Sequence, residues 1–235
     1  MALKDEILEE AENIFGFQWT SRDGYVVPAP GDIKLTTNDA VKFDSVVVLY
    51  ADLKASTQMV DAKKPSFAAE VYRGFLAAAA RVIRHEGGEI TAYDGDRIMA
   101  VFLDDEKESH AARCGLKINY AVKKIVTPTL QKYWSGSTFE VKHVVGIDVS
   151  PMFVARTGIR GGNDLVWVGR AANYAAKLCN LGADGHSTYV TDRVFEAMTE
   201  TTKYGGNPRQ LMWESRTWTD MNKISIYRSS WTWSV

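Results

Sequence analysis

The chain has 235 residues, of which 46% are hydrophobic and 24% are charged, and its formal net charge is -1. This composition suits one globular domain with a sizeable core and excludes a disordered or fibrous chain. The small net charge also excludes a broad basic surface for nucleic acid, so a polyanionic partner would have to be held by a local site.

The two cysteines, Cys114 and Cys179, have no CxxC spacing. They predict buried free thiols in a reducing cytosol rather than a disulfide scaffold or a zinc site. No stretch approaches the ~20 apolar residues that span a bilayer. The N-terminus is acidic, whereas a signal peptide is basic and then apolar. We therefore expect a cytoplasmic protein that binds neither membrane nor nucleic acid.

The first fifteen residues predict an amphipathic helix, because apolar residues recur at helical spacing. They are Leu3, Ile7, Leu8, Ala11, Ile14 and Phe15. Two partners for this stripe stay open, the chain's own domain and a dimer interface. A loop over 27–39, rich in Pro, Gly, Asp, Asn and Thr, follows. The expected organisation is a helix with its linker over 1–40 and a main domain over 41–235.

An unbroken apolar run predicts a buried strand near 43–52. Pro65 stands near the start of a long helix that ends at Gly87-Gly88. Residues 88–102 form two alternating runs about Asp94-Gly95, which is typical of a hairpin with a type I′ turn. Asp96 is expected just beyond that turn.

The second half of the chain alternates helices with short strands. We predict helices over 106–126, 170–180 and 192–200, and strands over 140–149, from about 153, and over 165–169, 187–191 and 223–227. The hairpin requires antiparallel pairing, so the order favours one α/β (α+β) domain with a mixed sheet over a regular βαβ series.

Tyr50 and Asp52 should project to the same side of the sheet, because alternate strand residues share a face. If the hairpin pairs beside this strand, Asp96 arrives next to Asp52. Two converging carboxylates repel each other unless a cation lies between them, and Mg²⁺ or Mn²⁺ is the expected ion. The plainer alternatives are a solvated turn residue for Asp96 and a capping residue for Asp52.

The loop after Asp52 has the composition of a phosphate-binding turn. It comprises residues 53–57 and includes Leu53, Ser56 and Thr57. Its backbone amides and hydroxyls are suited to wrap a polyphosphate at the start of a helix.

Three blocks in this order resemble class III nucleotidyl cyclases: YADLKAST at 50–57, GGEITAYDGDRIMAVF at 87–102 and VGRAANYAAKL at 168–178. The resemblance covers roughly residues 41–228 and implies a ferredoxin-like or palm-type catalytic domain over 41–235, with a mainly antiparallel sheet flanked by helices. It implies that Asp52 and Asp96 bind two metal ions per active site, with the backbone carbonyl of Leu53 as a further ligand.

The third block implies the remaining catalytic residues. Asn173 matches the asparagine that orients the ribose, and Lys177 stands where the family has an arginine for the α-phosphate. A lysine still supplies charge but lacks the planar bidentate fork. Asn173 and Lys177 are four apart and should share one helix face. Lys223 lies roughly where the family has a phosphate-binding lysine, with Arg216 as a rival.

Two departures concern base recognition. Adenylate cyclases have a lysine where this chain has Ala92 and an aspartate or threonine where it has Val166, so both groups that read adenine are absent. The chain also resembles the small cyclases of the Pycsar antiphage systems, including the tyrosine at position 50. That resemblance implies synthesis of cyclic UMP or cyclic CMP from UTP or CTP and activation of a separate effector protein.

The same resemblance implies a homodimer in which the aspartates of one subunit face the Asn173 helix of the other. Two alternative functions stay open: a purine cyclase with unusual base readers, and a non-catalytic module that binds nucleotide. The cluster Trp213, Trp218, Trp231 and Trp233 is expected to finish the core or a dimer surface.

Overall fold

The computed structural model describes residues 2–35, 37–159, 161–182 and 185–235. The chain forms two compact units, one of Met1–Ser45 with Ser150–Arg170 and one of Val46–Val149 with Ala171–Val235. Two long strands, β2 (Asp39–Leu53) and β5 (His143–Ile159), contribute one end to each unit. The predicted boundary near residue 40, between a helix with its linker and a catalytic domain, stays a prediction.

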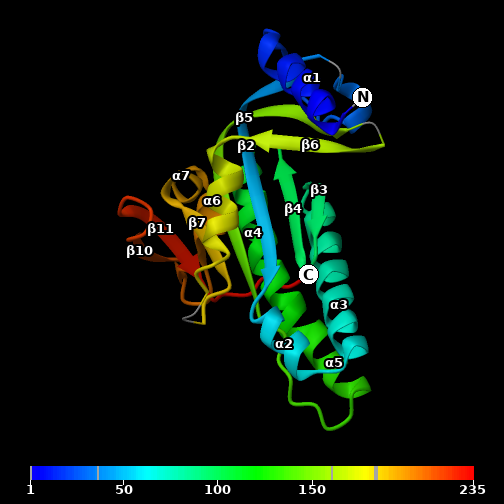
Figure 1. The fold of residues 1–235 in the computed structure, drawn as a ribbon. Coiled ribbons are helices and arrows are strands. Elements are labelled where there is room, and N and C mark those ends of the chain that lie inside the picture. Colours follow the sequence, from blue (N-terminus) through cyan, green and yellow to red (C-terminus); the bar gives the residue numbers. More distant parts are fainter. Residues whose placement is uncertain (1, 36, 160, 183–184) are drawn as a thin grey trace. The chain divides into compact units, whose positions relative to one another are not determined.

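The larger unit is built on a mainly antiparallel sheet (Figure 1). Its strand order is β10 (Glu214–Trp218), β11 (Ile224–Ser229), β7 (Thr188–Thr191), β5, β2, β4 (Arg97–Phe102) and β3 (Glu89–Asp94). Pairing is antiparallel for β10 with β11, β11 with β7, β2 with β4 and β3 with β4, and parallel for β5 with β7. A short separate pair joins β8 (Tyr204–Gly205) to β9 (Gln210–Leu211).

Helices α3 (Pro65–His85) and α4 (Lys107–Ala121) cover one face of this sheet (Figure 1). Phe75 of α3 and Leu116 of α4 share a buried cluster with Leu49 and Val145. Val144 belongs instead to a second cluster, with Leu178 of α6 (Arg170–Leu178). Because successive strand residues point to opposite faces, α6 lies on the face opposite α3 and α4.

The remaining helices of the larger unit are short. They are α2 (Ser56–Ala62), α5 (Thr127–Tyr133), α7 (Asp192–Ala197) and α8 (Glu200–Lys203). None of the helices in the described part of the chain is both long and apolar enough to cross a membrane.

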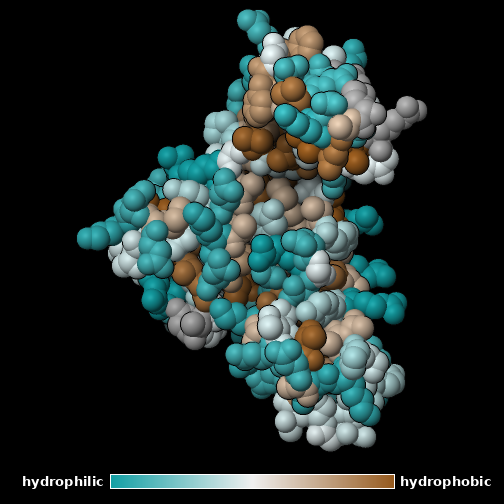
Figure 2. Space-filling model, viewed as in Figure 1, coloured by the Kyte–Doolittle hydropathy of each residue, from teal (hydrophilic) through white to brown (hydrophobic). Residues whose placement is uncertain are grey.

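The smaller unit contains α1 (Leu3–Gly16), β1 (Thr20–Asp23), η1 (Pro30–Asp32) and β6 (Gly162–Val168). β1 pairs with the first residues of β2, and β6 with the last residues of β5. Nδ2 of Asn38 donates to the carbonyls of Ile14 and Phe17 at the end of α1. The helix itself buries no residue, and Phe15 is 87% exposed. The surface of this unit accordingly shows hydrophobic side chains (Figure 2).

Three sequence expectations were wrong in extent. The helix predicted over 106–126 continues through a π-helical turn, η2 (Val122–Val126), into α5. Pro128 does not stop it, because it lies in the first turn of α5, directly after the π-helical turn, where a missing backbone N–H is tolerated. The strands predicted over 140–149 and from 153 are one strand, β5, which pairs with β6. The helix over 192–200 is two short helices.

Other expectations are confirmed. The helix from Pro65, the hairpin and the helix from Arg170 are present. Cys114 and Cys179 are buried free thiols. Trp213 is buried in the core with Trp231 and Trp233 packed against it, and Trp218 belongs to the second cluster, so these tryptophans serve packing.

Candidate active site

The end of β2 presents Tyr50 and Asp52 on one face of the sheet. The alternate residues Leu49, Ala51 and Leu53 belong to the cluster with α3, so Tyr50 and Asp52 point the other way. A third side chain confirms this orientation, because the Arg97 guanidinium lies 5.8 Å from the Tyr50 ring centroid and also contacts Asp52. The predicted shared face is therefore confirmed.

Asp52 is held by its neighbour across the sheet. The register pairs Asp52 with Arg97, the first residue of β4. Arg97 donates two hydrogen bonds to Oδ2 of Asp52, from Nε at 3.1 Å and from Nη2 at 2.7 Å. Both side chains are largely buried, with 16% of Asp52 and 31% of Arg97 exposed. This ion pair fixes the carboxylate at the strand end.

Asp96 lies inside the hairpin turn, which corrects the expectation that it stands beyond it. Asp94 pairs with Arg97, so the two turn residues are Gly95 and Asp96. Only Gly95 has a positive φ, +59°, which is the pattern of a type II′ turn with glycine at the first central position. The turn therefore brings the Asp96 carboxylate up beside the strand end.

The two carboxylates act on each other electrostatically. The pKa of Asp52 is raised, mainly because burial disfavours its charged form, and the negative charge of Asp96 raises it further against the opposing effect of Arg97. One oxygen of Asp96, Oδ2, is buried and has no hydrogen-bond partner among the described residues. A buried carboxylate oxygen without a donor is suited to a cation.

The acidic pair fits a hard divalent ion. The described residues contain no cluster of three or more His, Cys, Asp or Glu side chains suited to a metal. Mg²⁺ commonly takes only one or two protein carboxylates and completes its shell with water and substrate phosphates. Two aspartates at an open strand end match that donor set.

The loop after Asp52 leads directly into a helix. Ala55 adopts a left-handed conformation with φ 58°, and α2 begins at Ser56. Ser56 is partly buried and Thr57 is exposed at the first turn. The predicted helix start is thus present beside Asp52, while the role of its hydroxyls stays a prediction.

Asn173 and Lys177 lie together on the exposed side of α6. The buried side of this helix contains Ala171, Ala175 and Leu178. Nζ of Lys177 lies 3.6 Å from Sδ of Met221. In the described part of the chain, no hydrogen bond or ion pair links Asn173 or Lys177 to either aspartate. Each chain therefore holds two separate sets of candidate catalytic groups.

The position of α6 depends on close contact with β5. A Cβ at Gly146 would lie 2.2 Å from the carbonyl oxygen of Ala175, so only glycine fits there. Sγ of Cys179 lies 3.5 Å from the carbonyl oxygen of Tyr50 and 3.7 Å from that of Val144. Burial raises the pKa of this thiol to about 12, so it stays protonated and can donate to these carbonyls.

Comparison with known proteins identifies the family. The chain is 47% identical to a uridylate cyclase from Burkholderia cepacia and 45% identical to one from Xanthomonas perforans, in both cases over the whole of both chains. It is 35% identical to a uridylate cyclase from Rhodovulum sp., over 98% of this chain and 97% of that one.

The chain belongs to the uridylate cyclase family. No model of a known protein family matches it. Its fold is that of class III nucleotidyl cyclases. The guanylyl cyclase Cya2 superposes with a TM-score of 0.67 at 19% identity, over 80% of this chain and 93% of that one. The adenylyl cyclase CyaB from P. aeruginosa gives 0.64 at 17% identity, over 81% and 95%.

The other candidate residues of this nucleotidyl cyclase differ in their position and exposure. Ala92 is partly buried in β3, opposite Met99 and next to a register shift. Val166 is 38% exposed on β6 of the smaller unit. Lys223 is exposed, with a positive φ in the turn before β11 rather than in a strand. Their roles in base and phosphate binding stay predictions.

Sequence reasoning missed Arg97, the residue in closest contact with Asp52. The signal was present, because an antiparallel hairpin beside β2 places the residue after the turn opposite the strand end. In this cyclase that residue is an arginine, so the protein itself supplies a counter-charge to the Asp52 carboxylate.

Proposed function

We propose that the protein converts UTP to 3′,5′-cyclic UMP and pyrophosphate. The main support is one observation: Asp52 and Asp96 pair at the end of a strand in a chain whose full-length relatives are uridylate cyclases. The activity printed in the relatives' names is theirs, and we extend it to this chain as a hypothesis. CTP is the nearest alternative substrate.

In this proposal Asp52 and Asp96, with the carbonyl of Leu53, hold two Mg²⁺ or Mn²⁺ ions. The buried, unpartnered Oδ2 of Asp96 supports the assignment. When bound, such ions lower the pKa of the attacking hydroxyl and neutralise triphosphate charge. Arg97 must release Oδ2 of Asp52 for that carboxylate to bind a metal with both oxygens.

The remaining residues position the nucleotide. The bond between the ribose 3′-oxygen and the α-phosphorus forms, the bond from that phosphorus to the β-phosphate bridging oxygen breaks, and the hydroxyl proton passes to solvent. Asn173 orients the ribose for in-line attack and Lys177 stabilises the charge that develops on the α-phosphate. Lys223 and the turn at Ser56 and Thr57 hold the β- and γ-phosphates.

Tyr50, Ala92 and Val166 are the proposed base-contacting residues. Two apolar side chains offer no donor or acceptor to a purine edge. Tyr50 is partly buried, and burial raises the pKa of its hydroxyl despite the nearby Arg97, so the hydroxyl stays protonated as a donor. A large aromatic side chain with a polar tip narrows a site in favour of a single-ring base.

The exposed pair Asn173 and Lys177 supports a homodimer with two composite sites. Each site would combine the aspartates of one subunit with α6 of the other. We further infer from the Pycsar resemblance that the protein is cytoplasmic and that its product activates a separate effector in defence against phage.

Product analysis tests the function directly. The purified chain is incubated with UTP, CTP, ATP or GTP and either Mn²⁺ or Mg²⁺, and products are identified by chromatography and mass spectrometry. We expect cyclic UMP from UTP. Cyclic AMP or cyclic GMP as the main product would identify a purine cyclase, and no turnover of any nucleotide would favour a binding module.

Asp52→Asn is the matching variant, because it keeps the shape and removes the charge. It should abolish turnover while the chain stays folded by circular dichroism. Asp44→Asn changes an exposed aspartate of the same strand and should leave turnover unchanged. Full activity of Asp52→Asn would refute the metal assignment.

A further inference from the structure

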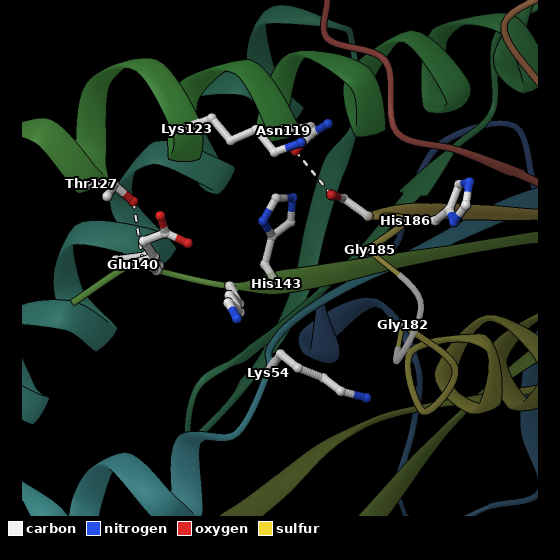
Figure 3. Close-up of a pocket in the computed structure, with 12 residues that line it drawn as sticks. Lys54, Asn119, Lys123, Thr127, Glu140, His143, Gly182, Gly185 and His186 are labelled. Carbon is white, nitrogen blue, oxygen red and sulfur yellow. Dashed lines mark hydrogen bonds between the residues drawn. The ribbon is translucent and has the colours of Figure 1, made fainter. Parts of the chain in front are cut away.

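A cavity of about 290 Å³ lies in the larger unit beside the first residues of β5 (Figure 3). Among the described residues, its walls come from four places in the chain: Lys54 after β2, residues 119–127 on the helix that runs from α4 to α5, residues 140–143 at the start of β5, and residues 182 and 185–187 before β7. The size is near the lower end for small-molecule sites.

His143 projects into this cavity (Figure 3). The residue is only 6% exposed, and its Nε2 is buried with no hydrogen-bond partner in the described part of the chain. Its ring packs against Phe75, with centroids 5.8 Å apart. A buried polar nitrogen of this kind requires an explanation, because nearly all such groups in folded proteins are paired.

The charge state of His143 is defined by its surroundings. Burial, together with repulsion from Lys123, lowers the pKa of His143 to about 3. The ring is therefore neutral at physiological pH, with one nitrogen protonated and able to donate. It contributes a hydrogen-bonding group to the cavity and no charge.

The cavity wall is predominantly basic. Among the described residues that line it are three lysines, Lys54, Lys123 and Lys142, one carboxylate, Glu140, and a second histidine, His186. Nζ of Lys54 donates to the carbonyl of Leu181 at 3.0 Å. The pKa of Lys123 is lowered by burial and by its neighbour Lys124, so an anion nearby would stabilise its charged form. Three ammonium groups from separate elements suit an anion with several oxygens.

The cavity is distinct from the nucleotide site. His143 packs with Phe75 of α3 and so lies on the α3 side of the sheet. Tyr50 and Asp52 project to the opposite side, and neither lines the cavity. Lys54, two residues after Asp52, is the one cavity residue in the loop that follows the metal-binding strand.

We propose that this cavity is a second anion-binding site, which takes a phosphate group as free phosphate or as part of a small phosphorylated molecule. Lysines bind phosphate as point charges, and the Thr127 hydroxyl and the His143 ring add directional donors. A phosphate ion alone does not fill the cavity, which leaves room for a small organic group.

Calorimetric titration of the full chain tests this site, without metal or nucleotide and with inorganic phosphate or ribose 5-phosphate as probe. We expect saturable binding of at least one probe. Preference for the ester would identify a phosphorylated molecule as the source, and equal or better binding of phosphate would identify the free ion. If neither probe saturates, the proposal is wrong.

Matched lysine variants locate the binding. Lys123→Gln should weaken it about tenfold, because it removes one charged hydrogen bond. Lys124→Gln, on the same helical turn but outside the cavity wall, should have no effect. Lys177→Gln on α6 should also bind normally. Equal weakening by Lys123→Gln and Lys124→Gln, or loss of binding in Lys177→Gln, would overturn the assignment.

The NMR signals of the His143 ring report whether the probe binds next to this side chain, which the lysine variants alone do not show. In protein labelled with ¹⁵N-histidine, the His143 ring signals, assigned by comparison with His143→Gln, should shift on saturation with the probe. Unchanged ring signals at saturation would show that the probe binds elsewhere. All these measurements omit substrate, so they stand apart from the proposed cyclase activity.

Discussion

Asp52 lies between two opposing charges, the guanidinium of Arg97 and the carboxylate of Asp96. Arg97 binds Oδ2 at 2.7 Å, while Asp96 raises the carboxyl pKa of Asp52. Burial strengthens both effects, because a low local dielectric weakens screening. The proposed metal ions and Arg97 therefore compete for one carboxylate, and Arg97 stabilises the site when no metal is bound.

Replacement of Arg97 should expose this competition. Arg97→Gln leaves the two aspartates without their counter-charge, so we expect the metal-free protein to lose about 1–2 kcal/mol of unfolding free energy. Mn²⁺ should restore most of that stability and should bind more tightly than in the unmodified protein. Urea unfolding in EDTA and across a Mn²⁺ titration measures both effects.

Arg73→Gln, an exposed arginine on α3, serves as the control and should change neither quantity. An equal loss of stability with and without Mn²⁺ would show that Arg97 supports only the fold.

Tyr50 should govern the choice of base. Tyr50→Ala enlarges the proposed site and removes its polar tip, so we expect turnover of ATP relative to UTP to rise by about tenfold. Tyr50→Phe keeps the ring and separates the role of the hydroxyl. Competition assays with both nucleotides in one tube measure the ratio. An unchanged ratio in both variants would remove Tyr50 from base recognition.

The site was predictable from the sequence where a short motif fixes local geometry. Because side chains alternate along a strand, Tyr50 and Asp52 share one face of the sheet. Because Asn173 and Lys177 are four residues apart, they share one face of a helix. The position of Asp96 was missed by one residue, because Asp94-Gly95 and Gly95-Asp96 both tolerate a tight turn and strand register selects between them. Arg97 required that same register.

At the scale of elements, a buried ion network joins the end of α3 to α4. The Glu86 side chain is 2% exposed, and Arg113 and Lys117 of α4 contact it at 2.5 and 2.8 Å. Burial alone would raise the pKa of Glu86, but hydrogen bonds from Lys117 and Arg113 outweigh it and hold that pKa below its usual value. The carboxylate therefore stabilises the fold in its charged form.

Removal of this charge should weaken the fold in a pH-dependent way. Because the folded-state pKa of Glu86 is depressed, its contribution is present above the unfolded-state value and is lost as pH falls through the folded value. Glu86→Gln should lower the unfolding free energy by about 2–3 kcal/mol at pH 7 and by much less at acid pH. Urea unfolding at several pH values measures this.

Glu89→Gln, an exposed residue close by in the sequence, should have little effect at any pH. A loss for Glu86→Gln of the same size at pH 7 and at acid pH would mean that packing, and not charge, links the two helices.

The seating of α6 on β5 gives a prediction about catalytic geometry. In Gly146→Ala the new methyl group would meet the carbonyl of Ala175 at 2.2 Å, and a backbone atom cannot move alone. The helix should shift, with a stability loss of about 1–3 kcal/mol and a fall in kcat through misplaced Asn173 and Lys177. Thermal unfolding and steady-state kinetics report the two effects.

Gly74→Ala is the matched control. The nearest atom to its added Cβ would be Val126 Cγ1 at an ordinary 3.7 Å, and alanine is a better helix former than glycine. It should stabilise the protein by about 0.5–1 kcal/mol and leave kcat unchanged. Normal kcat in Gly146→Ala would separate the position of α6 from catalysis.

Helices and strands were predictable where the hydrophobic periodicity was strong and start and stop residues were clear, as for α3 between Pro65 and Gly87-Gly88. The length of β5 was not predictable, because a proline within a strand is typical of an edge or a break, whereas β5 runs through Pro151 and pairs with β7 over 145–147 and with β6 over 153–159. The continuation of the helix beyond residue 126 into α5 was missed because a proline, Pro128, is typical of a helix end, whereas Val126 and Leu130 pack against the core along a continuing helix.

For the whole molecule, the central question is how the two sets of proposed catalytic groups in one chain come together. The aspartates lie at a strand end and hairpin turn, and Asn173 with Lys177 lies on the exposed face of α6 without a bond between the sets in the described residues. A two-fold symmetric dimer would form two equivalent sites, because its axis places the aspartates of each subunit opposite α6 of the other.

Complementation between inactive variants tests this assembly. Asp52→Asn damages only the metal half of each site and Asn173→Ala only the ribose half, so each homodimer should be inactive. If subunits exchange freely, half of the dimers in an equal mixture are heterodimers, and each has one intact site and one doubly damaged site. Mixing should therefore restore about a quarter of the unmodified activity. Cyclic UMP formation during co-incubation measures the recovery. A mixture of Asp52→Asn with Asp96→Asn has both lesions in the same half and should stay inactive, so recovery in that control, or none in the first mixture, would contradict composite sites.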